Sequence, residues 1–241
     1  MPFPLRLLSP LVLSLILAAC SSSSGASPSP THAISRRAPP SLAAPLPHSY
    51  AALGASETFG VGAVPYHRGY AYLLAHDLHA RHFVDVGIPG TTLPAGYDTE
   101  LTRVLTNRPA LCTVFFGFND LRAGVTRGTF LADLRDLMAT LRRAGAQIII
   151  VSLPTPSLVP AVTHLNIGNL DAIVHRWNAG MQRVARQTGA HFFDLTRFDR
   201  EIAHHPGYIS PDGLHPSNAG HARLAQLLYR YILLNRLWPS R

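Results

Sequence analysis

Residues 50–60 read YAALGASETFG. A short apolar run ends at Gly54-Ala55-Ser56, and a polar residue, Glu57, opens the next segment. An apolar run bounded by glycine is typical of a buried strand, and the polar segment after it is typical of the start of a helix. Ser56 is therefore either the cap of that helix or a reactive side chain presented at the end of a strand. The choice depends on which other polar side chains the fold brings to the same place.

Short apolar runs alternate with helix-period stretches along the rest of the chain. We predict strands at residues 49–53, 82–87, 110–117, 146–154 and 191–195, and helices at 69–81, 98–107, 130–141, 173–184 and around 224–234. Gly145 and Gly189 are expected to end two of the helices, because glycine is favoured just after a helix. Strands alternating with helices predict an α/β fold, in which right-handed crossovers build a mostly parallel sheet between helical layers.

The N-terminal segment is predicted to be a signal peptide over residues 1–19. Its apolar part, residues 7–19, is shorter than the roughly 20 residues that span a bilayer. The small residues before Cys20 resemble a bacterial lipobox, which implies that Cys20 is lipidated. The alternative is an ordinary signal peptide cleaved after Ala19. In either case the protein is expected to be exported, and either lipid-anchored at the cell envelope or secreted.

A change in composition separates two further regions. Residues 20–47 are rich in Ser, Pro and Ala and contain little large apolar surface, so we predict a disordered tether. Residues 48–241 have the length and apolar content of one domain with a single core. Contact with a membrane is therefore expected only through a lipid anchor, and the sequence leaves the oligomeric state open.

The basic residues exclude several classes of function. The chain contains no lysine, so all 21 basic residues are arginine. A lysine Schiff base, a Ser–Lys dyad and a phosphate-binding loop of the G-x-x-x-x-G-K type are therefore excluded. The formal net charge is +8, but the arginines are scattered and have no aromatic partners at a repeating interval. We expect no nucleic-acid partner, because such a surface needs a basic stripe.

Five residues follow predicted strands in the way expected of a site. Ser56, Gly90 and Asn119 come soon after the first three strands, and Asp212 and His215 lie between the fifth strand and the last helix. In an open α/β sheet, sites gather in the loops beyond the carboxyl ends of the strands. We therefore expect these five residues to lie close together.

Their chemistry is complementary. A serine hydroxyl is a poor nucleophile until a base accepts its proton, and His215 can act as that base while Asp212 orients it. Attack on an ester carbonyl creates an oxyanion, which needs preorganised hydrogen-bond donors. The backbone N–H groups of Ser56 and Gly90 and the side-chain amide of Asn119 are three such donors. The set predicts nucleophilic hydrolysis of an ester.

Four motifs, GAS, GIPG, GFND and DGLHP, stand in this order between residues 50 and 223. Together they resemble the SGNH, or GDSL-type, family of esterases and lipases. The resemblance implies a three-layer α/β/α sandwich with a flavodoxin-like, five-stranded sheet. It also implies that Ser56, Asp212 and His215 form a catalytic triad, with Ser56, Gly90 and Asn119 as the oxyanion hole, and that no cofactor or metal is needed.

That resemblance implies hydrolysis of carboxylic esters through an acyl-enzyme, on a small-molecule, lipid or glycan ester. Two alternatives stay open: a polysaccharide or glycan O-deacetylase of the same fold, and a catalytically silent lipoprotein that binds envelope components. The chain departs from the family pattern at two positions. Ala55 stands where the family usually has aspartate, and Asp85 stands where it commonly has asparagine. These differences bear on how the nucleophile loop is held.

Each candidate also has a purely structural interpretation. Ser56 is a suitable helix cap, although Phe59 rather than Glu or Gln occupies the capping-box position. Asn119 is suited to a turn and Gly90 to a tight bend. Asp212 can make a local turn and His215 can pack against a loop.

A metal site is a further alternative, raised by His204, His205, His215 and His221. Their spacing matches no common zinc motif, so we expect no metal. Of the two cysteines, Cys112 lies in an apolar run and is predicted to be a buried core residue.

Overall fold

The structure is a computed structural model that describes residues 43–163 and 169–239. All of these residues belong to one compact unit, Ala38–Arg241. The predicted signal peptide, the lipidation of Cys20 and most of the predicted tether lie outside the described residues.

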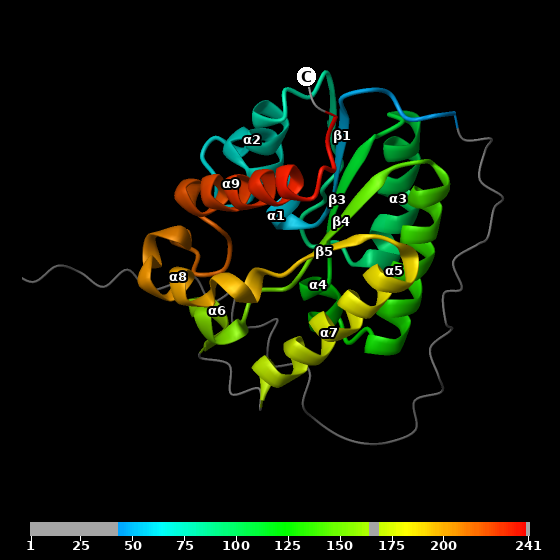
Figure 1. The fold of residues 1–241 in the computed structure, drawn as a ribbon. Coiled ribbons are helices and arrows are strands. Elements are labelled where there is room, and N and C mark those ends of the chain that lie inside the picture. Colours follow the sequence, from blue (N-terminus) through cyan, green and yellow to red (C-terminus); the bar gives the residue numbers. More distant parts are fainter. Residues whose placement is uncertain (1–42, 164–168, 240–241) are drawn as a thin grey trace, which may run out of the picture. The chain divides into compact units, whose positions relative to one another are not determined.

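A five-stranded sheet forms the centre of the domain, and every neighbouring pair of strands is parallel (Figure 1). The strand order is β2-β1-β3-β4-β5, which is the flavodoxin-like order. The strands are β1 (Ser49–Gly54), β2 (His82–Asp85), β3 (Leu111–Phe115), β4 (Gln147–Val151) and β5 (His191–Phe193). The predicted sheet is confirmed, with each strand where an apolar run was found.

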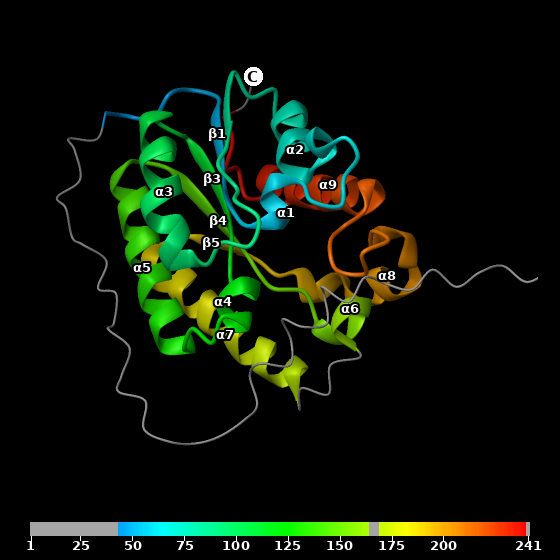
Figure 2. The ribbon, with the colours of Figure 1, turned by 180° about the vertical axis from the view of Figure 1, so that it is seen from behind.

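Helices cover both faces of the sheet (Figures 1 and 2). One face carries α3 (Leu93–Thr106), α5 (Arg127–Arg143) and α7 (Leu170–Thr188), and the other carries α2 (Tyr70–Asp77) and α9 (Asn218–Leu234). Successive strand residues point to opposite faces, so Ala51 and Leu53 of β1 pack into the first core and Tyr50 and Ala52 into the second. The three-layer arrangement is therefore also confirmed.

Four short helices follow the carboxyl ends of strands. They are α1 (Ser56–Phe59), α4 (Phe118–Arg122), α6 (Pro160–Thr163) and α8 (Asp199–His204). Segments this short cannot show a helical period, which explains why the sequence pattern did not reveal the last three. They fill the edge of the sheet at which a site is expected.

The start of α3 differs from the prediction, because the helix begins at Leu93 rather than at residue 98. Asp120 Oδ1 accepts the Leu93 N–H at 2.9 Å and so satisfies a donor at the first turn. A cap supplied by a distant residue leaves no local signal in the sequence.

Cys112 is completely buried in β3, as predicted, and burial raises the pKa of its thiol.

The segment ahead of β1 is hydrogen-bonded to Arg108, which lies shortly before β3. Leu46 N–H donates to Arg108 O at 2.8 Å, and Arg108 Nε donates to Ala44 O at 2.8 Å.

Among the described residues, no helix has the length and apolar character needed to cross a membrane.

Candidate active site

The loop that carries Ser56 is shaped by Gly54. Its φ of +153° is disfavoured for other residues. A Cβ atom at this position would lie 2.3 Å from Thr58 Oγ1 and 2.5 Å from Phe115 O. Only glycine allows the end of β1 to approach both neighbours this closely.

Ser56 is the first residue of α1, and Ala55 precedes it at the capping position. No side chain caps the N-terminus of this helix. Ser56 Oγ instead donates to Glu57 Oε2 at 3.2 Å, and Ser56 is 9% exposed. The helix-cap interpretation of Ser56 is therefore wrong, because its hydroxyl does not cap the N-terminus of α1.

Asn119 lies in α4, directly after β3, and is 9% exposed. Its Nδ2 donates to Thr91 O at 3.0 Å, which joins it to the loop that carries Gly90. Gly90 is exposed and has a φ of +82°, and a Cβ atom there would meet nothing within 4 Å. Within the described residues, the N–H groups of Ser56 and Gly90 donate to no protein acceptor.

Asp212 and His215 are hydrogen-bonded to each other. His215 Nδ1 donates to Asp212 Oδ2 at 2.7 Å, which leaves Nε2 of a neutral imidazole as an acceptor. Asp212 Oδ1 accepts from Ser210 Oγ and from the backbone N–H groups of Leu214 and His215, at 2.7, 2.8 and 2.9 Å. Partial burial would raise the pKa of Asp212, but these four hydrogen bonds outweigh it and hold the pKa well below its usual range.

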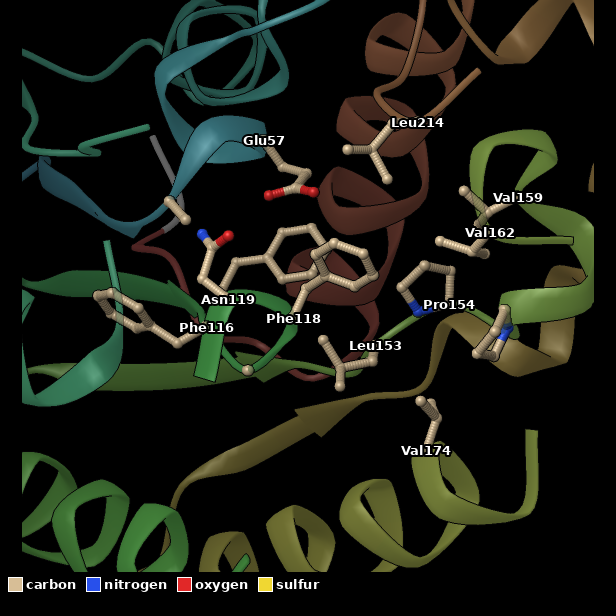
Figure 3. A pocket seen from close by; sticks show the side chains of 14 residues that line it. Glu57, Phe116, Phe118, Asn119, Leu153, Pro154, Val159, Val162, Val174 and Leu214 are labelled. Carbon is tan, nitrogen blue, oxygen red and sulfur yellow. The ribbon is translucent and has the colours of Figure 1, made fainter. Parts of the chain in front are cut away.

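A single pocket joins three of these loops, as Figure 3 shows. Its lining includes Ala55 and Glu57 on either side of Ser56, Asn119 after β3, and Leu214 beside His215. The structure therefore gathers the loops that follow β1, β3 and β5 around one cavity. The exposed Gly90 is brought to Asn119 through the contact with Thr91 rather than through the pocket lining.

A family model of GDSL-like lipases and acylhydrolases matches residues 52–223, a span that includes all five candidate residues. The chain belongs to this family. The span also includes all five strands of the sheet, apart from the first residues of β1. The resemblance inferred from the four motifs is therefore confirmed.

Solved structures have the same fold as this GDSL-like domain. A lipase/acylhydrolase from Enterococcus faecalis is 22% identical with a TM-score of 0.63, and covers 80% of this chain and 98% of its own. The esterase EstA from Pseudoalteromonas sp. is 20% identical with a TM-score of 0.62, covering 78% of this chain and 99% of its own.

A third similar structure is a variant of Axe2, an acetylxylan esterase from Geobacillus stearothermophilus. It is 20% identical with a TM-score of 0.63, and covers 83% of this chain and 100% of its own. No curated protein matches this chain.

Two carboxyl groups lie near the candidate nucleophile of the GDSL-like domain: Asp85, found from the sequence as a departure from the family pattern, and Glu100, which was not singled out from the sequence. Glu100 of α3 is 1% exposed, and its Oε2 accepts the Gly54 N–H at 3.0 Å. Asp85, at the end of β2, accepts the Gly87 N–H at 2.8 Å. Burial raises the pKa of Glu100 to about 8 and that of Asp85 to about 7. A glutamate on the buried face of an amphipathic helix is the signal that could have identified Glu100.

His221 also has a clear place in the GDSL-like domain. It is completely buried in α9, where Nδ1 accepts the Tyr70 N–H at 3.1 Å and Nε2 donates to Val61 O at 3.0 Å. Burial lowers its pKa. His221 therefore joins α9 to the segment that follows the candidate nucleophile Ser56. Within the described residues, no group of three histidine, cysteine or acidic side chains is arranged to hold a metal ion.

Proposed function

We propose that the protein hydrolyses carboxylic esters through an acyl-enzyme formed on Ser56, with His215 as general base and Asp212 as its orienting partner. The observation that carries this proposal is the 2.7 Å hydrogen bond between His215 Nδ1 and Asp212 Oδ2, made beside the pocket that Ala55, Glu57 and Asn119 line. Membership of a family of lipases and acylhydrolases supports the same chemistry.

In this mechanism, Ser56 Oγ attacks the carbonyl carbon of the ester while its proton passes to His215 Nε2. The tetrahedral intermediate then collapses, the carbon–oxygen bond to the alcohol breaks, and His215 gives its proton to the leaving alcohol. A water molecule attacks the acyl-enzyme in the same way and releases the acid. Asp212 stays ionised throughout, because its hydrogen bonds hold its pKa low, and it stabilises the imidazolium.

The oxyanion would be held by three donors. The N–H groups of Ser56 and Gly90 have no protein acceptor in the described part of the chain, so both are available. Asn119 has two N–H bonds on Nδ2, and the one that donates to Thr91 O fixes the orientation of the amide while the other remains for the substrate. Removing one such donor typically reduces the rate about 100-fold to 1,000-fold.

In the free protein, Ser56 Oγ donates to Glu57 rather than to His215. The proposal therefore requires the hydroxyl to rotate about its side-chain torsion toward His215 when substrate binds. Catalytic hydrogen bonds are often absent or long before substrate is present and form in the Michaelis complex.

The test is hydrolysis of a series of p-nitrophenyl esters, from acetate to palmitate, by the unaltered protein and by Ser56→Ala. We expect Ser56→Ala to lose at least about 1,000-fold in kcat. Turnover that survives in Ser56→Ala would contradict the proposal. Folded protein with no turnover on any ester would favour the alternative of a silent, envelope-binding lipoprotein.

A glycan O-deacetylase is the second candidate, and the size of the pocket favours it. The cavity at Asn119 has a volume of about 30 Å³, which suits a small acyl group such as acetyl, and the adjoining cavity of about 110 Å³ is left for the alcohol part of the ester. Acetylxylan esterases are among the similar structures. A rate that is highest for the acetate ester and falls steeply with chain length would support this candidate.

The place of action also belongs to the proposal. A signal peptide over residues 1–19 and lipidation at Cys20 would anchor the domain at the cell envelope, with residues 20–47 as the tether. Metabolic labelling with a fatty acid tests this, because the label should be lost in Cys20→Ser. Label retained in that variant would contradict lipidation at Cys20.

A further inference from the structure

Glu57 occupies an unusual electrostatic position beside the candidate nucleophile. Its carboxylate turns into the pocket, where Leu214 and Phe118 also project (Figure 3). Its hydrogen bond is to Ser56 Oγ at 3.2 Å. Among the described residues, no cationic side chain forms an ion pair with it.

The lining around this carboxylate is otherwise almost entirely apolar. Apart from Glu57, the only polar side chain that the described residues contribute to the pocket lining is that of Asn119. The aromatic side chains that line it are Phe115, Phe116 and Phe118. A substrate that fills the pocket therefore displaces water from the Glu57 carboxylate. Because no cationic side chain of the described residues pairs with this carboxylate, the loss of water is unfavourable unless the substrate itself carries a positive charge.

A second, larger cavity of about 110 Å³ meets the first at Glu57. It contains a charged pair, but this pair is already satisfied: Arg223 Nε and Nη2 donate to Glu201 at 2.6 and 2.9 Å, and Tyr208 Oη donates to Glu201 Oε1 at 3.3 Å. The unpaired charge that faces both cavities is therefore that of Glu57.

This charge also opposes the proposed chemistry when the substrate is neutral. The oxyanion forms on the carbonyl oxygen of the carbon that Ser56 Oγ attacks, and Ser56 Oγ is within hydrogen-bond distance of Glu57. Two negative charges so close together repel strongly once water has left. A cation placed beside both would replace the repulsion with attraction, and aromatic rings such as Phe118 add a favourable cation–π contact.

We propose that the pocket beside Ser56 selects esters that carry a positively charged group close to the scissile bond, and that Glu57 recognises this group. The inference rests on the proposed function, since it names the substrate class of the same site. Glu57 acts here through contact with the substrate, and it takes no part in proton transfer.

The test compares two esters of the same shape that differ by one charge: acetylcholine and 3,3-dimethylbutyl acetate, in which carbon replaces the quaternary nitrogen. Acetate release is followed at low ionic strength, with Ser56→Ala as the blank. We expect kcat/KM to favour acetylcholine by at least about 10-fold, and Glu57→Gln to reduce this preference to within about twofold.

Asp98→Asn is the matched control, because it removes the same charge from an exposed position on α3 and should keep the preference. Tetramethylammonium chloride provides a test without any variant. It should inhibit hydrolysis of 3,3-dimethylbutyl acetate competitively, whereas equal concentrations of sodium chloride or tert-butanol should not.

The outcomes separate the two proposals. Ser56-dependent turnover with equal kcat/KM for the two esters would overturn the role of Glu57 and leave ester hydrolysis intact. A preference for acetylcholine that persists in Glu57→Gln would also overturn it. Absence of Ser56-dependent turnover on every ester would overturn both proposals.

Discussion

Glu100 Oε2 accepts the backbone N–H of Gly54 at 3.0 Å, two residues before the candidate nucleophile. Val86 N–H donates to Ala52 O, and Ile88 N–H donates to Gly54 O. In a regular parallel ladder the Gly54 N–H would then donate to Val86 O. Instead, the carboxyl group of Glu100, on α3, accepts this N–H. The loop that carries the candidate nucleophile is therefore held by a helix side chain where a neighbouring strand would ordinarily hold it.

This contact bears on the departure at position 55. Ala55 is buried and has no polar group with which to hold the loop. We expect Glu100→Leu to lower kcat about 10-fold to 100-fold with little change in KM, because small displacements of a nucleophile have effects of this size. Glu100→Gln should stay within about threefold of the unaltered protein, because its amide oxygen still accepts from Gly54.

Steady-state kinetics on p-nitrophenyl acetate, with thermal unfolding to verify the fold, checks this prediction. Asp98→Leu, at an exposed position of the same helix, is the control and should leave kcat unchanged. If Glu100→Gln lost as much activity as Glu100→Leu, the hydrogen bond to Gly54 would not be the cause.

Stability should decrease with increasing pH above neutrality. Burial raises the pKa of Glu100 from 4.5 to about 8, so the folded state binds a proton that the unfolded state has released. The stabilisation is complete below the unfolded pKa and is lost as the pH rises through about 8. Burial lowers the pKa values of His191 and His221, and these groups act in the opposite direction, but only at and below the ordinary histidine pKa of 6.5.

Denaturant unfolding between about pH 7 and 8 therefore separates the buried carboxyl groups from these histidines and from Cys112, whose thiol ionises in the unfolded state only near its ordinary pKa of 9.0. The free energy of unfolding should fall across this range for the unaltered protein and fall less for Glu100→Gln. The same slope in both proteins would show that Glu100 is not the group responsible.

Asp212→Asn should reduce kcat by about 100-fold or more, because an amide at this position no longer holds His215 in the productive tautomer or stabilises its positive charge. Asp194→Asn is a matched control. Asp194 Oδ1 accepts from Thr196 N and Thr196 Oγ1 at 3.1 and 2.7 Å, a similar local turn without a histidine. Equal losses of kcat in the two variants would indicate that Asp212 only shapes its loop.

Gly54→Ala should reduce both stability and activity, because its Cβ atom would overlap Thr58 Oγ1 and Phe115 O. We expect a loss of about 2–4 kcal/mol in the free energy of unfolding, from overpacking added to backbone strain. Gly124→Ala is the control for strain alone: its φ is +74°, and a Cβ atom there meets nothing within 4 Å. Similar losses measured by denaturant unfolding would show that the close contacts at Gly54 are unimportant.

The sheet could be predicted because each of its strands is a local apolar run, and the candidate residues could be found because they follow those runs in sequence. Contacts between distant residues could not be predicted in this way. Asp120 caps the start of α3, and Glu100 bonds to Gly54. Each of these two contacts joins segments that only the complete fold brings together. No local sequence pattern therefore predicts either contact.

The departure at Asp85 has a similar explanation. Its Oδ1 accepts the Gly87 N–H, and a Cβ atom on Gly87 would lie 2.6 Å from Phe59 N. Asp85 therefore shapes a loop that packs directly against α1, the helix that begins with Ser56. The sequence revealed the substitution, but only the packing of the two loops shows what it affects.

The order of the strands has a consequence for how the protein becomes active during synthesis. Ser56 follows the first strand formed by the chain, whereas Asp212 and His215 precede the last helix. A parallel sheet pairs segments that are far apart in sequence, so its formation requires closure of long loops and is comparatively slow. A growing chain carries the proposed nucleophile, Ser56, long before the proposed base, His215, is made. Catalytic competence would then arise in one late step, when the final helix docks and the whole domain has folded.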